Sequence, residues 1–217
     1  GVAVLPPDIN LSAVDFTVVY AHRDGKGPLA RGPGRLRDRL GPQIRFGLGA
    51  VRGVGEMALE TMFEARTAGG PFGDLFDLAT RVDSKRLNKG VLESLVQCGA
   101  FDTVLEPAGI TRARAYAAVD RALERSRSAG RDRERGQTNL FGMFDAGAKK
   151  NGGGGSSAGD EYPIALEWDR MELLRRERAA LGCYVSGHPL FRYQSKLSRL
   201  GATGTLELAS EKAWSAV

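Results

Sequence analysis

Apolar residues recur at helical spacing through the middle of the chain, and this spacing predicts three helices there. The first covers 56–66 and ends before Gly69-Gly70-Pro71, and the second covers 72–82. The third begins after Asn88, whose side chain can cap it, and ends at Gly99. Their apolar positions are Met57, Leu59, Met62 and Phe63, then Phe72, Leu75, Phe76, Leu78 and Ala79, then Val91, Leu92, Leu95 and Val96.

Other patterns flank this helical region. Residues 15–20 and 44–46 are extended and rich in β-branched and aromatic positions, which predicts a small β-hairpin with a lengthened tip. Further helices are predicted over 111–128, over 163–181 with a proline in its first turn, and over 189–200. The apolar faces of the two longer helices are Tyr116, Val119 and Leu123, and Ile164, Trp168, Met171, Leu174 and Leu181. The expected fold class is therefore mainly α.

Two segments break the periodicity. Residues 22–41 hold six Lys or Arg, five Gly and two Pro, which predicts a mobile basic loop. Residues 146–159 are a low-complexity tract of Gly, Ala, Ser, Lys and one Asn, which predicts a disordered linker.

Composition excludes several classes of protein. The chain has 217 residues and a formal net charge of +5, and no apolar run approaches the ~20 residues of a membrane span. Two cysteines and two histidines exclude a disulfide framework, a four-thiolate zinc site and a histidine-rich metal site. Free thiols suit a reducing cytoplasm, which is the expected location. The first methionine is Met57, so we expect a piece of a longer protein.

A glycine-containing turn before the first helix is a candidate phosphate site. Gly53 and Gly55 flank Val54, which we expect to point inward. Glycines allow a tight turn and a close approach of phosphate to the backbone, and the N-terminus of the following helix favours an anion. A helix-hairpin-helix motif binds phosphate in this way, although an ordinary turn that uses glycines for helix packing has the same pattern. Arg52 adds a positive charge to it.

A second helix–turn–helix unit follows at 76–98. Its turn at 83–87 carries cations instead of glycines, and Lys85, Arg86 and Lys89 are the candidate phosphate contacts. Two paired units would form a tandem module with two phosphate-binding corners on one side, and Arg45 would lie on its rim. An ordinary solvated surface explains the same cations, because scattered Lys and Arg are usual there.

Residues 136–144 contain the pattern Gln-x-x-Leu-Phe, formed by Gln137, Leu140 and Phe141. A Leu-Phe pair beside a predicted linker favours a docking peptide. Alternatively, the apolar side chains fold back onto their own domain. The preceding helix and its extension are rich in arginine and could face DNA, a protein partner or solvent, with Arg112, Arg114, Arg121, Arg125, Arg127, Arg131, Arg133 and Arg135.

Several strings together closely resemble the bacterial DNA polymerase III alpha subunit, a family C replicative polymerase. They occur in the family's order over most of residues 2–193. They are Leu5-Pro6-Pro7-Asp8-Ile9-Asn10, Ile44-Arg45-Phe46-Gly47-Leu48-Gly49-Ala50-Val51, Gly53-Val54-Gly55, Asn88-Lys89 with Val91-Leu92-Glu93, Gly99-Ala100-Phe101-Asp102, Gly136-Gln137 with Leu140-Phe141-Gly142, and Leu181-Gly182 with Tyr184 and Ser186-Gly187-His188-Pro189-Leu190. The loop at 22–41 and the linker look longer than is usual in the family.

The resemblance implies an organisation and partners. The segments would be the end of a fingers domain with its β-hairpin (1–47), a tandem helix-hairpin-helix DNA-binding domain (48–135), a sliding-clamp-binding peptide (136–144), a linker (145–160), and helices leading towards an oligonucleotide-binding fold (161–217). Duplex DNA, a sliding clamp and other replicase subunits would be the partners, with no membrane. The residues implied to bind the clamp are Gln137, Thr138, Asn139, Leu140 and Phe141.

The resemblance also bears on catalysis. Family C polymerases resemble other polymerases in holding two magnesium ions with palm-domain carboxylates, and no such aspartate set is present in this sequence. We therefore expect no cofactor in this segment and no polymerase activity from it alone, while its parent would use Mg²⁺ to synthesise DNA from dNTPs. A helix-hairpin-helix repair enzyme of the glycosylase type and a structural connector that binds nothing are the competing hypotheses.

Overall fold

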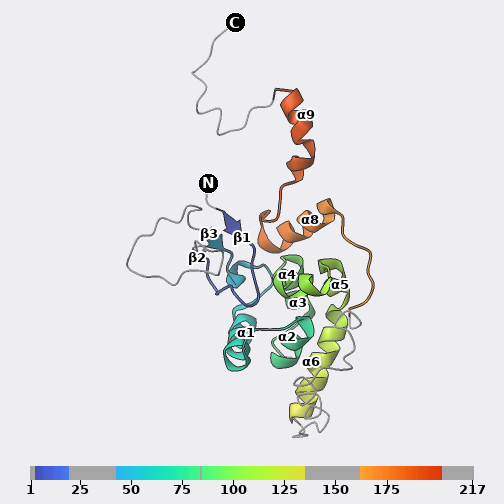
Figure 1. The fold of residues 1–217 in the computed structure, drawn as a ribbon. Helices are drawn as coiled ribbons and strands as arrows, with labels where there is room; N and C mark the ends of the chain where they lie inside the picture. The colour runs from blue at the N-terminus through green and yellow to red at the C-terminus, as the bar shows by residue number, and fades with distance from the viewer. Residues whose placement is uncertain (1–2, 20–42, 84, 135–161, 202–217) are drawn as a thin grey trace, which may run out of the picture.

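The computed structural model describes residues 3–19, 43–83, 85–134 and 162–201, and it is mainly helical (Figure 1). A small sheet lies at one side of the helical body, and the last helix projects away from this body. Within these residues, no helix is long and apolar enough to cross a membrane. The basic loop predicted at 22–41, the predicted clamp-binding peptide and the predicted linker lie outside the described residues.

The sheet has three short strands in the order β1-β3-β2. Strands β2 (Thr17–Val19) and β3 (Gln43–Arg45) pair antiparallel, with Val18 opposite Ile44, so the predicted hairpin pairing is confirmed. Strand β1 (Val4–Leu5) adds a parallel pairing to β3 that was not predicted. Two residues are too few to show an alternating pattern, so this strand forms only through its tertiary partner.

The helices follow one another with short connections. They are α1 (Glu56–Gly69), α2 (Leu75–Arg81), α3 (Lys89–Gln97), α4 (Asp102–Leu105), α5 (Arg112–Ala117), α6 (Val119–Glu134), α8 (Arg170–Leu181) and α9 (Gln194–Arg199), with 3-10 turns η1 (Leu48–Ala50), η2 (Glu106–Ala108) and η3 (Pro189–Tyr193). Four of them begin at capping side chains, Asp74, Asn88, Thr111 and Asp169, each accepting a bond from a backbone N–H three residues on. The cap predicted at Asn88 is confirmed, and such a cap stabilises a helix by about 1 kcal/mol.

The core lies between α2, α3, α5 and α6. Leu75, Leu78, Leu92 and Leu95 are fully buried in it. Burying one such side chain contributes about 1.5–3 kcal/mol, which makes this interior the main source of stability. Tyr162, although 87 residues after Leu75 in the sequence, packs at the edge of this core. Its hydroxyl accepts a bond from the Leu75 N–H at 3.2 Å.

The helix predicted over 111–128 is two helices. Helix α5 ends at Ala117, and α6 begins directly after Ala118. The two helices pack on different partners, α5 on α3 and α6 along α2, and the bend between them allows both contacts. Ala118 is fully buried, and its small side chain permits this close approach. Nothing in an alanine-rich sequence marks such a bend.

The helix predicted over 163–181 begins seven residues later, at Arg170. The Arg114 guanidinium donates to the carbonyl of Tyr162 at 3.0 Å and to that of Pro163 at 3.4 Å, which holds this segment non-helical against α5. Ile164, expected on the apolar face, is therefore 97% exposed. Leu174 and Leu181, on the same predicted face, are buried as expected.

The two cysteines differ sharply in environment, and their reactivity is expected to differ. Burial raises the pKa of the Cys98 thiol to about 12, whereas Cys183 is exposed. Since the thiolate is the nucleophile, iodoacetamide at pH 8 should alkylate Cys183 in the folded chain and both thiols after denaturation. Mass spectrometry counts the adducts, and rapid labelling of Cys98 in the folded chain contradicts this prediction.

Candidate nucleic-acid interface

The first turn connects η1 to α1 and leaves backbone open to solvent. Gly53 has φ +81°, a left-handed conformation that favours glycine, and Val54 is buried as expected. Gly55 has φ −77°, so its conformation does not require glycine. A Cβ added at Gly55 would meet no described atom within 4 Å. Since neither conformation nor packing demands this glycine, it leaves space for a ligand to approach the start of α1.

The start of α1 also carries an acidic residue. Gly55 is the N-cap and offers no side-chain bond, while Glu56 lies in the first turn. A carboxylate there stabilises the helix dipole and repels phosphate. A phosphate at this turn must therefore approach from the side of Gly53 and Gly55, away from the Glu56 carboxylate.

The second turn, between α2 and α3, is held by Asp83. Its carbonyl accepts bonds from the N–H groups of Arg86 and Leu87 at 3.0 and 3.1 Å, and its carboxylate accepts the N–H of Lys85 at 2.9 Å. Leu87 is buried beneath this turn. Lys85 and Arg86 are exposed, so the turn presents two adjacent cations.

The structure brings the two turns together. The Arg86 guanidinium donates to the Met57 sulfur at 3.1 Å, and Met57 lies two residues after Gly55. Met57 was expected on the buried face of α1 but is 50% exposed, because it faces this second turn. One edge of the molecule thus combines an open glycine turn with the cations of Lys85 and Arg86.

The other predicted contacts are placed differently. Lys89 lies 2.8 Å from the Asp120 carboxylate of α6 and 4.0 Å from Glu93, and the bond to Asp120 raises the pKa of its amino group. A phosphate at Lys89 must compete with these carboxylates. Arg45 lies at the sheet, where it makes a 3.5 Å contact to the Pro6 carbonyl.

Arg52 connects the first turn to α8. Its backbone N–H donates to the Ala180 carbonyl at 2.8 Å. Its guanidinium lies over Gly182, where an added Cβ would come within 2.9 Å of the Arg52 Nη2. The positive end of this side chain therefore sits at the C-terminal end of α8, next to the first turn.

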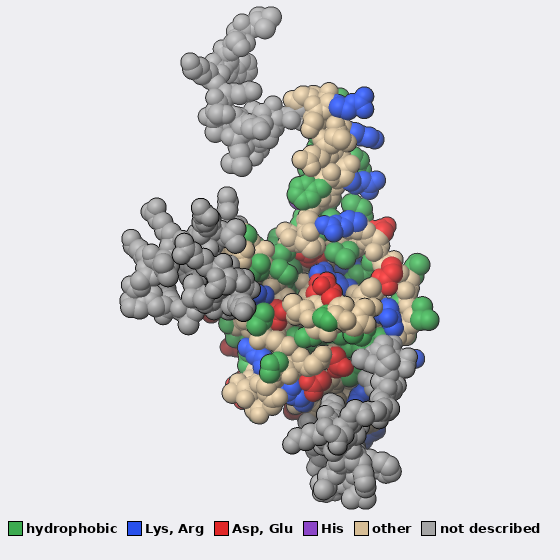
Figure 2. All heavy atoms as spheres, in the orientation of Figure 1, with side chains coloured by type: hydrophobic (Ala, Val, Ile, Leu, Met, Phe, Trp, Pro, Cys, Tyr) green, Lys and Arg blue, Asp and Glu red, His purple; other side chains and the backbone are tan. Residues whose placement is uncertain are grey.

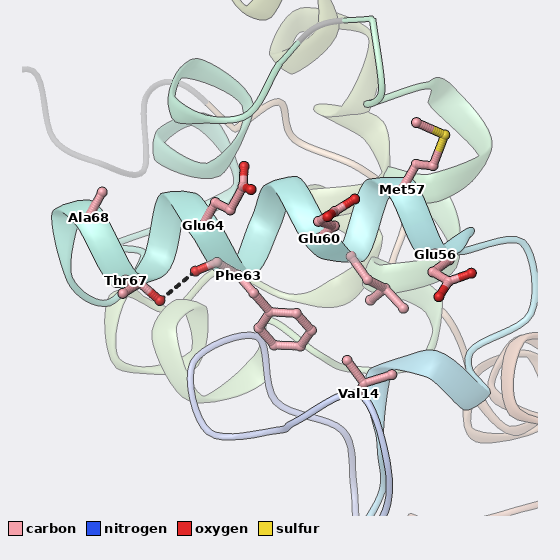
Figure 3. Close-up of a pocket in the computed structure, with 9 residues that line it drawn as sticks. Val14, Glu56, Met57, Glu60, Phe63, Glu64, Thr67 and Ala68 are labelled. Atoms are coloured by element: carbon pink, nitrogen blue, oxygen red, sulfur yellow. Dashed lines mark hydrogen bonds between the residues drawn. The ribbon is translucent and has the colours of Figure 1, made fainter.

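An acidic groove borders the site along α1 (Figure 3). Its volume is about 900 Å³, and both apolar side chains and carboxylates line it. It is lined by Val14, Glu56, Met57, Leu59, Glu60, Phe63, Glu64, Thr67 and Ala68. The three lining carboxylates disfavour a phosphate backbone in this groove, while Arg66 over the Phe63 ring and Arg86 at the Met57 sulfur are the cations that adjoin it. Sequence reasoning missed the groove, although the spacing of Glu56, Glu60 and Glu64 places all three on one helix face.

The predicted clamp contacts Gln137, Thr138, Asn139, Leu140 and Phe141 lie outside the described residues, as do 1–2 and 202–217. In the parts of the chain that are described, no three His, Cys, Asp or Glu side chains come together in a way that could hold a metal ion.

Comparison with known proteins gives consistent matches. The helix-hairpin-helix motif family matches residues 1–115. The chain is 38% identical over 213 residues to the DNA polymerase III subunit alpha of Thermus aquaticus, covering 97% of this chain and 14% of that protein. It is 33% identical over 212 residues to the same subunit of Haemophilus influenzae, and 33% identical over 199 residues to that of Escherichia coli K12. The chain spans 16% and 14% of the length of these last two relatives.

Proposed function

Because the chain belongs to the helix-hairpin-helix family and to the DNA polymerase III alpha subunits, we propose that it binds the backbone of duplex DNA and tethers a replicative polymerase to a sliding clamp. The observation that supports DNA binding best is the contact of Arg86 with Met57 at the start of α1, which places the cations of the second turn near the glycine turn. The two corners face one edge of the molecule, and the acidic groove limits the direction of approach.

The chemistry of this edge suits phosphate and no particular base. Lys85 and Arg86 supply charge, and the open backbone at Gly53 and Gly55 supplies N–H donors. Contacts of this kind fix a protein on a duplex without reading sequence. A polymerase segment needs such binding, because the newly made duplex has every sequence.

Removing both cations of the second turn is expected to weaken DNA binding and to reduce its salt dependence. Each lost phosphate contact lowers the slope of log K against log salt by about 0.9. The Lys85→Ala/Arg86→Ala variant should therefore lose about 1.8 from this slope. Fluorescence anisotropy of a labelled 20-base-pair duplex across a KCl series measures it. Lys85→Arg/Arg86→Lys is the matched control, since it keeps both charges and should keep the slope; an unchanged slope in the alanine variant contradicts the proposed site.

The tether would be the peptide Gln137–Phe141. Its support is the Gln-x-x-Leu-Phe pattern and the resemblance of this segment to the family's clamp-binding motif. Leu140 and Phe141 would fill an apolar pocket on the clamp, and the Gln137 amide would bond polar groups at the rim. In the competing arrangement these side chains pack on their own domain and no clamp binds.

The parent reaction would be template-directed DNA synthesis with Mg²⁺, in the cytoplasm, with other replicase subunits as partners. The chain covers a small share of its relatives, and we propose that the palm carboxylates belong to the remaining part. The isolated chain is expected not to incorporate nucleotides. We assign no catalytic residue within it.

A repair glycosylase remains the second hypothesis to test. Such an enzyme needs a catalytic Asp, often with a Lys, near the second helix of the motif. The structure does bring Lys89 and Asp120 together, but their side chains are 53% and 70% exposed and do not line the acidic groove. A surface ion pair accounts for this contact. We therefore expect no cleavage of a duplex that contains an abasic site.

A further inference from the structure

The end of the described chain forms a projecting segment, the C-terminal arm, made of η3 and α9 (residues 189–200). Residues 190–201 are all exposed, and the arm points away from the helical body (Figure 1). At its base the arm lies against α8, where Phe191 and Arg192 line a groove with Met171 and Leu174. The rest of the arm is available to a ligand.

One side of the arm is basic. Arg192, Lys196 and Arg199 are spaced four and three residues apart, which places them on one helical face. Figure 2 shows Lys and Arg side chains aligned along one side of the arm. No Asp or Glu occurs between Gly182 and Gly201, so the arm itself carries no carboxylate. Asp169, the N-cap of α8, lines the same groove as Arg192 at the base of the arm. Three parallel cations on an arm without acids of its own form a surface that complements a polyanion.

The base of the arm is fixed on α8. Glu177, 1% exposed, accepts bonds from the N–H groups of Val185 and Ser186 at 2.5 and 2.8 Å and from the Ser186 hydroxyl. Arg170 donates to the Ser186 carbonyl at 2.8 Å. His188 then caps η3 by accepting the Leu190 N–H at 3.2 Å. These bonds set the direction in which the arm leaves the body.

The base of the arm also adjoins the proposed DNA site. Arg52 of the first turn lies over Gly182 and bonds the carbonyl of Ala180. Arg178, in the last turn of α8, is exposed and lies over the Tyr184 ring at 5.4 Å. Arg52 and Arg178 thus place two positive side chains between the first turn and the base of the arm.

We propose that the basic face of the C-terminal arm is a second binding surface for the nucleic-acid backbone, continuous with the first turn. It rests on the proposed DNA-binding function and extends it. The arm is roughly 19 Å long, which matches about five to six base-pair steps of a duplex. Arg192, Lys196 and Arg199 each contact phosphates along this length, so the arm lengthens the bound duplex and adds no sequence preference.

The arm is tested with the 217-residue chain and the variant Arg192→Ala/Lys196→Ala/Arg199→Ala. On a 20-base-pair duplex the slope of log K against log KCl should fall by about 2.7, from about 0.9 per contact. On an 8-base-pair duplex, which the turns alone can cover, the variant should bind nearly as the unchanged chain does. Circular dichroism confirms that the variant is folded.

Two matched controls separate the arm's cations from its shape and from net charge. Gln194→Ala/Ser195→Ala/Ser198→Ala alters the same arm without removing charge and should leave the slope unchanged. Arg127→Ala/Arg131→Ala removes two exposed cations of α6, and Lys196→Ala/Arg199→Ala removes two from the arm. An equal effect of these two pairs, or an unchanged slope in the triple variant, overturns the inference.

The experiments distinguish an arm that does not bind DNA from a chain that does not bind DNA at all. If the Lys85→Ala/Arg86→Ala variant lowers the slope and the arm variant does not, the two turns bind DNA and the arm does not. If the unchanged chain shows no salt-dependent affinity for a duplex, both the proposed DNA-binding function and the arm's role are wrong.

Discussion

Replacing Glu177 with alanine is expected to lower the free energy of unfolding by about 3 kcal/mol, because it removes a buried charged acceptor. The Glu177 carboxylate holds two backbone N–H groups and one hydroxyl in the segment between α8 and η3. Without it the N–H groups of Val185 and Ser186 lose their partners in a half-buried place. Urea unfolding followed by circular dichroism measures the loss.

The matched control is Glu172→Ala, also on α8. Glu172 pairs with Arg175 and Arg176 at the surface, and these partners lower the pKa of its carboxyl to about 2. Solvent screens such a pair, so this variant should unfold at nearly the same urea concentration as the unchanged chain. An equally small effect at Glu177 contradicts the anchoring role.

The same substitution has a consequence for DNA binding. Glu177 touches no proposed phosphate contact, but it fixes the segment from which the C-terminal arm starts. Glu177→Ala should therefore release the arm from its direction and weaken binding to a 20-base-pair duplex more than to an 8-base-pair one. Faster amide exchange at Val185 and Ser186 reports the release directly, whereas unchanged exchange contradicts it.

Features set by neighbouring residues could be predicted from the sequence. Asn88 caps α3, and Val91, Leu92, Leu95 and Val96 are buried, because cap and stripe both depend on local geometry. The end of α1 near Gly70 follows for the same reason, since Gly70 adopts φ +76°. The family could also be identified, because its strings are distributed along most of the chain.

Features set by distant partners could not be predicted. The late start of α8 depends on Arg114, 49 residues before Pro163, whose guanidinium holds the preceding carbonyls. The sequence predicts a phosphate contact at Lys89, yet its amino group pairs with Asp120 of another helix. The meeting of Arg86 with Met57 likewise joins residues 29 positions apart. In each case a side chain of one element fixes the conformation or the partner of a residue far away in the sequence. The spacing of apolar residues carries no information about such distant contacts.

Phe141→Ala is expected to abolish most clamp binding. An aromatic side chain that fills a pocket is typical of an interface hot spot, worth at least about 2 kcal/mol, which corresponds to a roughly 30-fold weaker affinity. The double variant Gln137→Ala/Phe141→Ala should show no heat of binding to a bacterial sliding clamp in a calorimetric titration. Thr138→Ala/Asn139→Ala changes the two implied contacts at the variable positions of the pattern, and it should weaken clamp binding less than the double variant.

Tethering and DNA binding should separate in these variants. Phe141 lies outside the proposed phosphate contacts in the sequence, so Phe141→Ala should keep the DNA affinity and salt slope of the unchanged chain. Lys85→Ala/Arg86→Ala should in turn keep the clamp affinity. If the unchanged chain and the double variant bind the clamp equally, or if neither binds it, the result would mean that Leu140 and Phe141 pack on their own domain. DNA binding would then be the function that the chain itself supports.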